Sequence, residues 1–351
     1  LVPETQPDPN APPPEGELPA GDQGVAIMAS GGAELAEEPG GAALVRAFQG
    51  LVMAVEARAG EWLRVRTPCD TRAWVEGRQV RFTPGAAPAE IGAGFDFAQG
   101  VLVLDPGHGG PNRGAVGPSG LVEAVVDLDI ARRARDLLQE PRTVDWRTGA
   151  LLPGDDIPPV GQVWLTRTEG PPGADYEAGL FFRAQVANMA GAHAFVSIHN
   201  NADPDGPFEG PGSEVFYSVK DRQSKRLAGI MIEEFRRGFQ DFDVHWVGDT
   251  DAGAKYRLRD DGETDYYGVL RRTDVPAVIA EGAFITNPEE EALLATAAFR
   301  QTYAEAVYRA LVRFLTTDDP GSGYTEPYPR TVPAGRGDPL PTCTVPAQPA
   351  T

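Results

Sequence analysis

The chain has 351 residues and a formal net charge of −20 at pH 7, with 51 acidic residues against 31 lysines and arginines. Binding to nucleic acid needs a concentration of basic side chains to meet the phosphates, so this charge excludes a nucleic-acid partner. No apolar run in the sequence approaches the roughly 20 residues of a membrane-spanning helix, and we therefore expect no insertion into a membrane.

Both ends of the chain have the composition of unfolded segments. Residues 1–23 and 317–351 are rich in proline, small residues and acids, and such segments bury too little apolar surface to offset the entropy lost on ordering. We therefore expect ordered structure between them. The two cysteines, Cys69 and Cys343, either form a disulfide in an exported protein or remain free thiols.

Residues 24–84 have the pattern of short strands between turns. Leu63 and Val65 alternate with basic residues, as expected of a half-buried strand. No cluster of acids, histidines or thiols in this region suggests chemistry. The stretches GEWLRVR and AWVEGRQVRF resemble the SH3-like modules that accompany bacterial cell-wall enzymes. This resemblance implies a small β-barrel with a wall-targeting role, and a plain structural spacer is the alternative.

From residue 98 onward, apolar strands alternate with amphipathic helices, which is typical of an α/β domain with a largely parallel sheet. We expect this domain to span residues 98–316, after a linker at residues 85–97. The candidate strands are residues 100–104, 162–166, 194–198, 213–218 and 277–281, and the candidate helices lie near residues 122–139, 179–190, 221–238 and 298–315.

The stretch VLVLDPGHGG, residues 101–110, places His108 just after a buried strand. The carboxyl ends of parallel strands form the edge where open α/β folds bind their ligands. The glycines around His108 leave no side-chain bulk beside it and allow positive φ angles. A histidine alone in such a loop is usually a hydrogen-bonded loop residue, so its assignment depends on its neighbours.

Three more polar residues lie, like His108, at the end of a predicted strand or in the helix turn beside it. His199 ends the strand of FVSIHNNAD, Glu281 ends the strand of AVIAEGAF, and Glu123 lies in the first turn of the helix after His108, directed away from its apolar face. An ionised carboxylate at the end of an apolar strand is costly without a cation or a partner. Two histidines and one carboxylate are the ligand set of a catalytic zinc site with an open position, and a second glutamate supplies the general base.

The set DPGHGG, Glu123, SIHNNA and AEGAFITNPEE resembles the zinc-dependent N-acetylmuramoyl-L-alanine amidases of bacterial cell walls, the amidase type 3 family. The resemblance runs from about Val101 to Leu315 and implies a mixed, largely parallel sheet of about six strands flanked by helices. It implies that Zn²⁺ is the cofactor, that His108, Glu123 and His199 are its ligands, and that Glu281 is the catalytic glutamate.

On this resemblance the protein is a cell-wall lytic enzyme that hydrolyses the amide between the lactyl group of N-acetylmuramic acid and L-alanine in peptidoglycan. Its partners are then the glycan strand and the stem peptide, and we expect a monomer. Two alternatives remain open: another zinc peptidase or deacetylase that acts on wall material, or a non-catalytic wall-binding protein. The expected location is exported, extracellular or periplasmic, and associated with the cell wall; the start at Leu1 suggests a removed leader.

Some residues near these motifs carry weaker signals. Asn200 and Asn201 either contact the substrate or only shape the turn after the strand. His193, at a helix-to-strand junction, is interpreted as structural. The acidic segment 240–266, which contains His245, is interpreted as a solvated loop; a second metal site and an autoinhibitory flap are the alternatives.

Overall fold

The structure is a computed structural model that describes residues 22–326, apart from residues 30, 69–70, 88 and 169–178. Most of the two proline-rich ends and both cysteines of the possible disulfide lie outside the described residues. Within the described part of the chain, no helix is long and apolar enough to cross a membrane.

Residues 24–84 form a seven-stranded antiparallel sheet with the order β3-β2-β6-β5-β4-β1-β7. In β5, Leu63 and Val65 are fully buried while the arginines between and after them are partly exposed, as the alternation predicts. The strands are β1 (Gly24–Met28), β2 (Ala33–Ala36), β3 (Ala43–Ala47), β4 (Val52–Ala59), β5 (Trp62–Arg66), β6 (Arg72–Glu76) and β7 (Val80–Pro84), with the short helix η1 (Gly77–Gln79) before β7.

The rest of the chain is built on a six-stranded mixed sheet with the order β11-β8-β12-β17-β14-β16. β14 runs antiparallel to β17, and the other neighbours are parallel. The expected mixed α/β fold is therefore confirmed. Its strands are β8 (Val101–Pro106), β11 (Gln162–Leu165), β12 (Ala194–Asn201), β14 (Glu214–Tyr217), β16 (Ala254–Lys255) and β17 (Ala277–Phe284).

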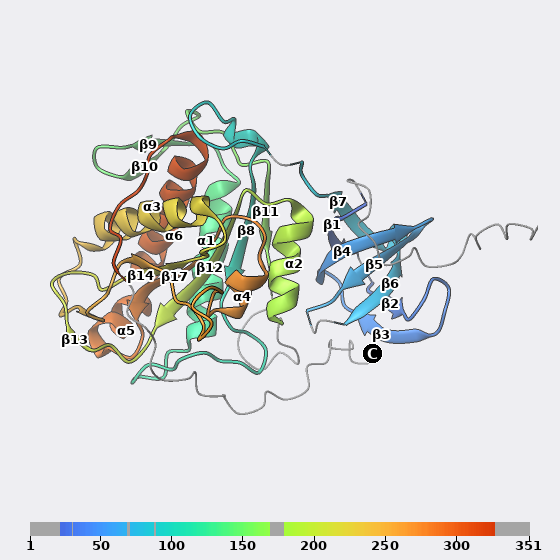
Figure 1. Ribbon diagram of the computed structural model, residues 1–351, viewed down its shortest axis with the longest axis horizontal. Coiled ribbons are helices and arrows are strands. Elements are labelled where there is room, and N and C mark those ends of the chain that lie inside the picture. The colour runs from blue at the N-terminus through green and yellow to red at the C-terminus, as the bar shows by residue number, and fades with distance from the viewer. Residues whose placement is uncertain (1–21, 30, 69–70, 88, 169–178, 327–351) are drawn as a thin grey trace, which may run out of the picture.

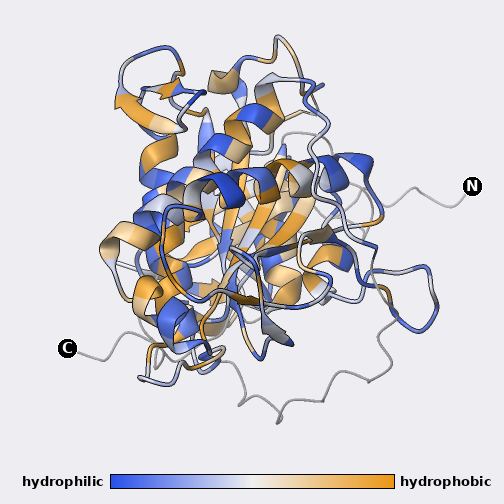
Figure 2. Cartoon of the chain, turned by 90° about the vertical axis from the view of Figure 1, so that its left-hand side faces the viewer, coloured by the Kyte–Doolittle hydropathy of each residue, from blue (hydrophilic) through white to orange (hydrophobic). Residues whose placement is uncertain are grey.

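Helices cover both faces of this sheet, because its strands are apolar on both sides. Leu102 and Leu104 of β8 face the cluster that contains α1, α3 and α6, whereas Val101 and Val103 face the cluster that contains α2 and α4. Figure 2 shows the apolar strands inside and polar helix faces outside. The helices are α1 (Glu123–Leu138), α2 (Leu180–Ala190), α3 (Arg222–Phe239), α4 (Gly268–Arg272), α5 (Pro288–Leu294) and α6 (Ala297–Thr316).

Short helices and strands lie in the loops that connect the main elements. The expected linker at residues 85–97 ends at a 3-10 helix whose first residue, Phe97, is buried. Two short antiparallel pairs lie in the loops: β9 with β10, and β13 with β15. These elements are η2 (Phe97–Gln99), β9 (Arg142–Asp145), β10 (Ala150–Pro153), β13 (Gly206–Pro207) and β15 (Val247–Gly248).

Helix α2 lies between the two sheets (Figure 1). Val25 of β1 and Val52 of β4 share a buried cluster with Phe182 of α2. The backbone N–H of Gly179, at the start of α2, donates to the carbonyl oxygen of Pro68 at 2.6 Å. The N-terminal sheet is therefore packed against the second half of the chain through α2.

Two stretches differ from the sequence interpretation. Residues 317–326, expected to belong to an unfolded tail, pass beside β16, where the N–H of Thr325 donates to the carbonyl of Ala254 at 2.9 Å. The segment 240–266 is not solvated throughout, because Lys255 is fully buried and β16 joins the central sheet. A two-residue strand has no periodicity, so the sequence pattern could not predict it.

Candidate metal centre

The four residues singled out in the sequence lie at one edge of the central sheet. His108 follows β8 by two residues, and His199 and Glu281 lie opposite each other on the parallel strands β12 and β17. Glu123 is the first residue of α1. The carboxyl-terminal halves of β12 and β17, the loop after β8 and the first turn of α1 thus bring all four residues to one side of the sheet.

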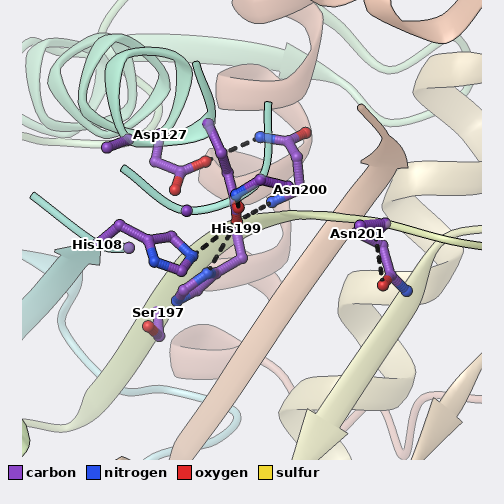
Figure 3. A network of polar contacts seen from close by, with 12 residues as sticks. His108, Asp127, Ser197, His199, Asn200 and Asn201 are labelled. Atoms are coloured by element: carbon purple, nitrogen blue, oxygen red, sulfur yellow. Dashed lines mark hydrogen bonds and ion pairs between the residues drawn. The ribbon is translucent and has the colours of Figure 1, made fainter. Parts of the chain in front are cut away.

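The carboxylate of Glu123 lies between the two imidazoles. Its Oε1 is 3.1 Å from Nε2 of His108 and 3.1 Å from Nδ1 of His199. The two rings are nearly perpendicular, at 78°, with their centroids 4.8 Å apart, and Figure 3 shows the two histidines side by side. Two ring nitrogens and a carboxylate oxygen therefore converge on one point, as the ligands of a single ion do.

The loop after β8 fixes the orientation of His108. The residue has a left-handed φ of 56°, and its Nδ1 is 3.0 Å from Oδ1 of Asn112. An Nδ1–H that donates there leaves Nε2 free to bind a metal. Glycine is required at position 107 by close approach, because a Cβ there would lie 2.4 Å from Cε1 of His199.

Glu123 is buried, with 3% of its surface exposed. The expectation that it points away from the apolar face was wrong, because its spacing of three and seven residues to Val126 and Ile130 places it on the same side of α1. The N–H of Ala115 donates to its Oε2 at 2.7 Å. Burial alone would raise the pKa of Glu123, but the hydrogen bonds with His108 and His199 hold it well below its usual range.

Burial sets the charge state of His199 and Glu281 in opposite ways. It lowers the pKa of the His199 imidazole, which favours the neutral form that a metal needs. It raises the pKa of the Glu281 carboxyl well above its usual range, and the negative charges of Glu123 and Glu214 raise it further. Glu214 lies opposite Glu281 on β14 and is itself paired with the buried Lys255.

The donor set fits a zinc ion. Zinc prefers imidazole nitrogens and carboxylate oxygens, and His108, Glu123 and His199 offer one such atom each, all within 4.8 Å of one another. In the described part of the chain, the buried Oε2 of Glu281 has no hydrogen-bond partner. A buried carboxylate oxygen without a protein partner is suited to hold a water molecule.

Comparison with known proteins agrees with this geometry. The sequence model of the Amidase_3 family, described as N-acetylmuramoyl-L-alanine amidase, matches residues 102–313. The chain belongs to this family. The resemblance seen in the sequence motifs is thereby confirmed. The family match favours the amidase over the two alternatives, which were another zinc peptidase or deacetylase and a non-catalytic wall-binding protein.

Individual amidases are also similar to this chain. The chain is 30% identical over 223 residues to the germination-specific N-acetylmuramoyl-L-alanine amidase of Bacillus subtilis, across 62% of this chain and 80% of that one. It is 30% identical over 245 residues to AmiA of Escherichia coli, across 61% and 76%. The solved catalytic domain of the amidase CwlV from Bacillus (Paenibacillus) polymyxa var. colistinus is 27% identical with a TM-score of 0.46, across 62% of this chain and 98% of that one.

Two buried arginines of the amidase hold the loop that carries His108. Arg183 of α2 donates to Oδ1 of Asp105 at 2.5 Å and to the carbonyl oxygens of Pro106 and His108 at 2.8 and 2.5 Å. Arg167, which follows β11, donates to the carbonyl oxygens of Pro106 and Gly107. Neither arginine was predicted from the sequence, although Arg183 lies on an otherwise apolar helix face, which is a signal of a buried and paired charge.

Arg183→Ala is expected to lower the free energy of unfolding by about 3–5 kcal/mol, because it leaves the carboxylate of Asp105 buried without its cation. Arg183 and Asp105 have side chains that are 4% and 1% exposed. Urea denaturation measures the effect, with Arg135→Ala as the control, since Arg135 pairs with Asp136 on the surface of α1. Equal unfolding free energies for the two variants would contradict this role of Arg183.

The NPEE motif holds the other side of the site. The carboxylate of Glu291 accepts from the N–H groups of Ser119 and Leu121, and that of Glu290 accepts from the N–H of Phe284 at the end of β17. The two glutamates therefore fix the loop before α1 and the end of the strand that carries Glu281.

The asparagines after His199 have internal partners. Asn200 is buried and donates to Oδ1 of Asp127 at 2.8 Å, so its amide nitrogen supports the site from inside. Asn201 donates to Oε2 of Glu214 at 2.5 Å. Both contacts involve acids that the sequence analysis did not select.

The other two histidines lie away from the metal centre. His193 accepts a hydrogen bond from the N–H of Val101 at the start of β8, which supports a structural role. His245 is exposed, and its Nδ1 is 2.7 Å from Oε1 of Glu289. Neither is grouped with His108 and His199 among the described residues.

Proposed function

We propose that the protein is a zinc-dependent enzyme that hydrolyses the amide between the lactyl group of N-acetylmuramic acid and L-alanine in peptidoglycan. The N-acetylmuramoyl-L-alanine amidase activity follows from the family and its relatives. The zinc dependence is supported by one observation above all: His108 and His199 converge on a single oxygen of Glu123.

In this proposal His108, Glu123 and His199 hold the metal, and Glu281 carries out the proton transfers. When bound, a zinc ion makes water acidic enough to ionise near neutral pH and polarises a carbonyl oxygen. Glu281 accepts a proton from the attacking water and delivers it to the alanine nitrogen as the C–N bond breaks. In the metal-free protein burial raises the pKa of this carboxyl, which makes the carboxylate a stronger base.

Metal removal is expected to abolish hydrolysis. Dialysis against a chelator should bring peptidoglycan hydrolysis to background, and stoichiometric Zn²⁺ should restore it. Mg²⁺ should not restore hydrolysis, because two of the three proposed ligands are imidazoles, which suit zinc better than magnesium. Zinc content and release of soluble fragments are measured on the same samples. Full hydrolysis by protein without zinc would contradict the proposal.

Zinc affinity is expected to be constant near neutral pH and to fall in acid. His199 must be neutral to bind the metal, and burial lowers its pKa below the usual 6.5 in the metal-free protein. A lowered pKa means that the ring gains its proton only below pH 6.5, so zinc affinity measured by chelator competition should fall only there. Glu123 stays ionised through this range, because its pKa is lowered too. A zinc affinity that already falls above about pH 7 would contradict this assignment.

We further propose the following organisation. Residues 24–84 form an SH3-like module and residues 98–316 form the zinc amidase domain, between proline-rich segments. The seven-stranded sheet of residues 24–84 and the family match at residues 102–313 support these limits. The partners are the glycan strand and the stem peptide, and the enzyme acts as an exported monomer at the cell wall, where its substrate lies.

A further inference from the structure

Asp127 is a second acid beside the proposed ligands. It lies one helical turn after Glu123 on α1 and is completely buried. One oxygen of Asp127 and one donor atom each of His108, Glu123 and His199 all lie within 4.8 Å of one another. Figure 3 shows Asp127 close to His108 and joined to Asn200.

The carboxyl group of Asp127 is only half satisfied. Its Oδ1 accepts from Nδ2 of Asn200 at 2.8 Å, while the buried Oδ2 has no hydrogen-bond partner among the described residues. Asp127 also takes part in none of the ion pairs found in the described part of the chain, although an ionised carboxylate in the interior is costly without a cation.

Acidic groups outnumber basic groups around Asp127. The acids that face Asp127 are Glu123 on its own helix and Glu281 on β17, and the two histidines are neutral when they bind a metal. Arg167 is the cation that opposes them, and its guanidinium is hydrogen-bonded to the carbonyl oxygens of Gly107 and Ala124. A divalent cation between the histidines would balance the remaining negative charge.

We propose that Asp127 tightens zinc binding by placing a second buried negative charge beside the metal, outside its ligand shell. This inference rests on the proposed metal centre of His108, Glu123 and His199. A fourth protein ligand would fill the position that a hydrolytic zinc site keeps open. Asn200, which follows His199 in the chain, holds Asp127 through its hydrogen bond and so links this charge to the ligand strand.

The test compares the zinc affinity of charge-removing variants by competition with a chromophoric chelator. Asp127→Asn keeps the size of the side chain and an oxygen that accepts from Asn200, and we expect it to bind zinc about 10–100-fold more weakly. Asp127→Ala should give a loss of the same order. Asp136→Asn removes an exposed charge from the same helix and should leave zinc affinity unchanged.

A second measurement places Asp127 outside the ligand shell. Asp127→Asn loaded with Co²⁺ should show the visible absorption bands of the unaltered protein, because all three ligands remain. Urea denaturation of the metal-free proteins verifies that the variants are folded. A changed cobalt spectrum, or a loss of zinc affinity in only one of the two Asp127 variants, would overturn the inference.

His199→Ala separates this inference from the proposed function. If His199→Ala weakens zinc binding severely while both Asp127 variants bind zinc as the unaltered protein does, Asp127 has no part in zinc affinity and the metal centre stands. If His199→Ala also binds zinc normally, the proposed centre itself is wrong and the inference about Asp127 fails with it.

Discussion

Glu281→Gln is expected to retain zinc and to lose about 10²–10⁴-fold in kcat, the contribution typical of a general acid–base group. Glutamine has the size of glutamate but can neither accept the proton of the attacking water nor return it to the alanine nitrogen. Zinc is retained because the proposed ligands are His108, Glu123 and His199, which all remain. The same is expected of Glu281→Ala.

The measurement combines zinc analysis of the purified variant with the rate of peptidoglycan hydrolysis. Glu289→Gln is the matched control, because Glu289 lies at an exposed position on α5, where it contacts His245. Normal turnover by Glu281→Gln would remove Glu281 from the chemistry. A variant that lost zinc together with activity would instead make Glu281 part of the metal-binding set.

His199→Ala is expected to lose both zinc and activity. The substitution removes one of the three proposed ligands. The two that remain, the carboxylate of Glu123 and the imidazole of His108, bind zinc too weakly to retain it. We expect zinc affinity to fall by more than the roughly 10–100-fold that the loss of an outer hydrogen-bond partner causes. Hydrolysis should fall to background at stoichiometric zinc.

His245→Ala is the control for this variant, because His245 is exposed and lies outside the His108 and His199 cluster. Chelator competition and hydrolysis of peptidoglycan are measured for both. A His199→Ala protein that holds stoichiometric zinc as tightly as the unaltered chain contradicts the assignment of ligands. A similar loss of zinc affinity and hydrolysis in His245→Ala would show that the loss in His199→Ala is not specific to the metal centre.

The sequence was sufficient for the elements whose patterns are long and regular. The helix expected near residues 122–139 is α1 at Glu123–Leu138, and the strand expected at residues 194–198 begins β12 at Ala194. Strands buried on both faces read as continuous apolar runs, so the strands that carry the site could be located from the sequence. Their ends could not: β12 and β17 continue to Asn201 and Phe284, beyond the polar residues His199 and Glu281 at which the apolar runs stop.

The supporting residues of the site could not be predicted. Asp105 and Arg183 are far apart in the chain, and their buried ion pair depends on how α2 packs against β8. Asp127 falls one turn after Glu123, but a lone acid on a helix is normally solvated, and its burial follows from the tertiary fold. The pairing of Lys255 with Glu214 depends on the two-residue strand β16, which leaves no pattern in the sequence.

The most direct test of the account is the identity of the bond that is cleaved. Purified peptidoglycan is digested with the zinc-loaded protein, and the products are identified by mass spectrometry. The account predicts free stem peptides that begin with L-alanine, together with glycan strands that have lost their peptides. Cleavage within the stem peptide, or loss of acetyl groups alone, would contradict it.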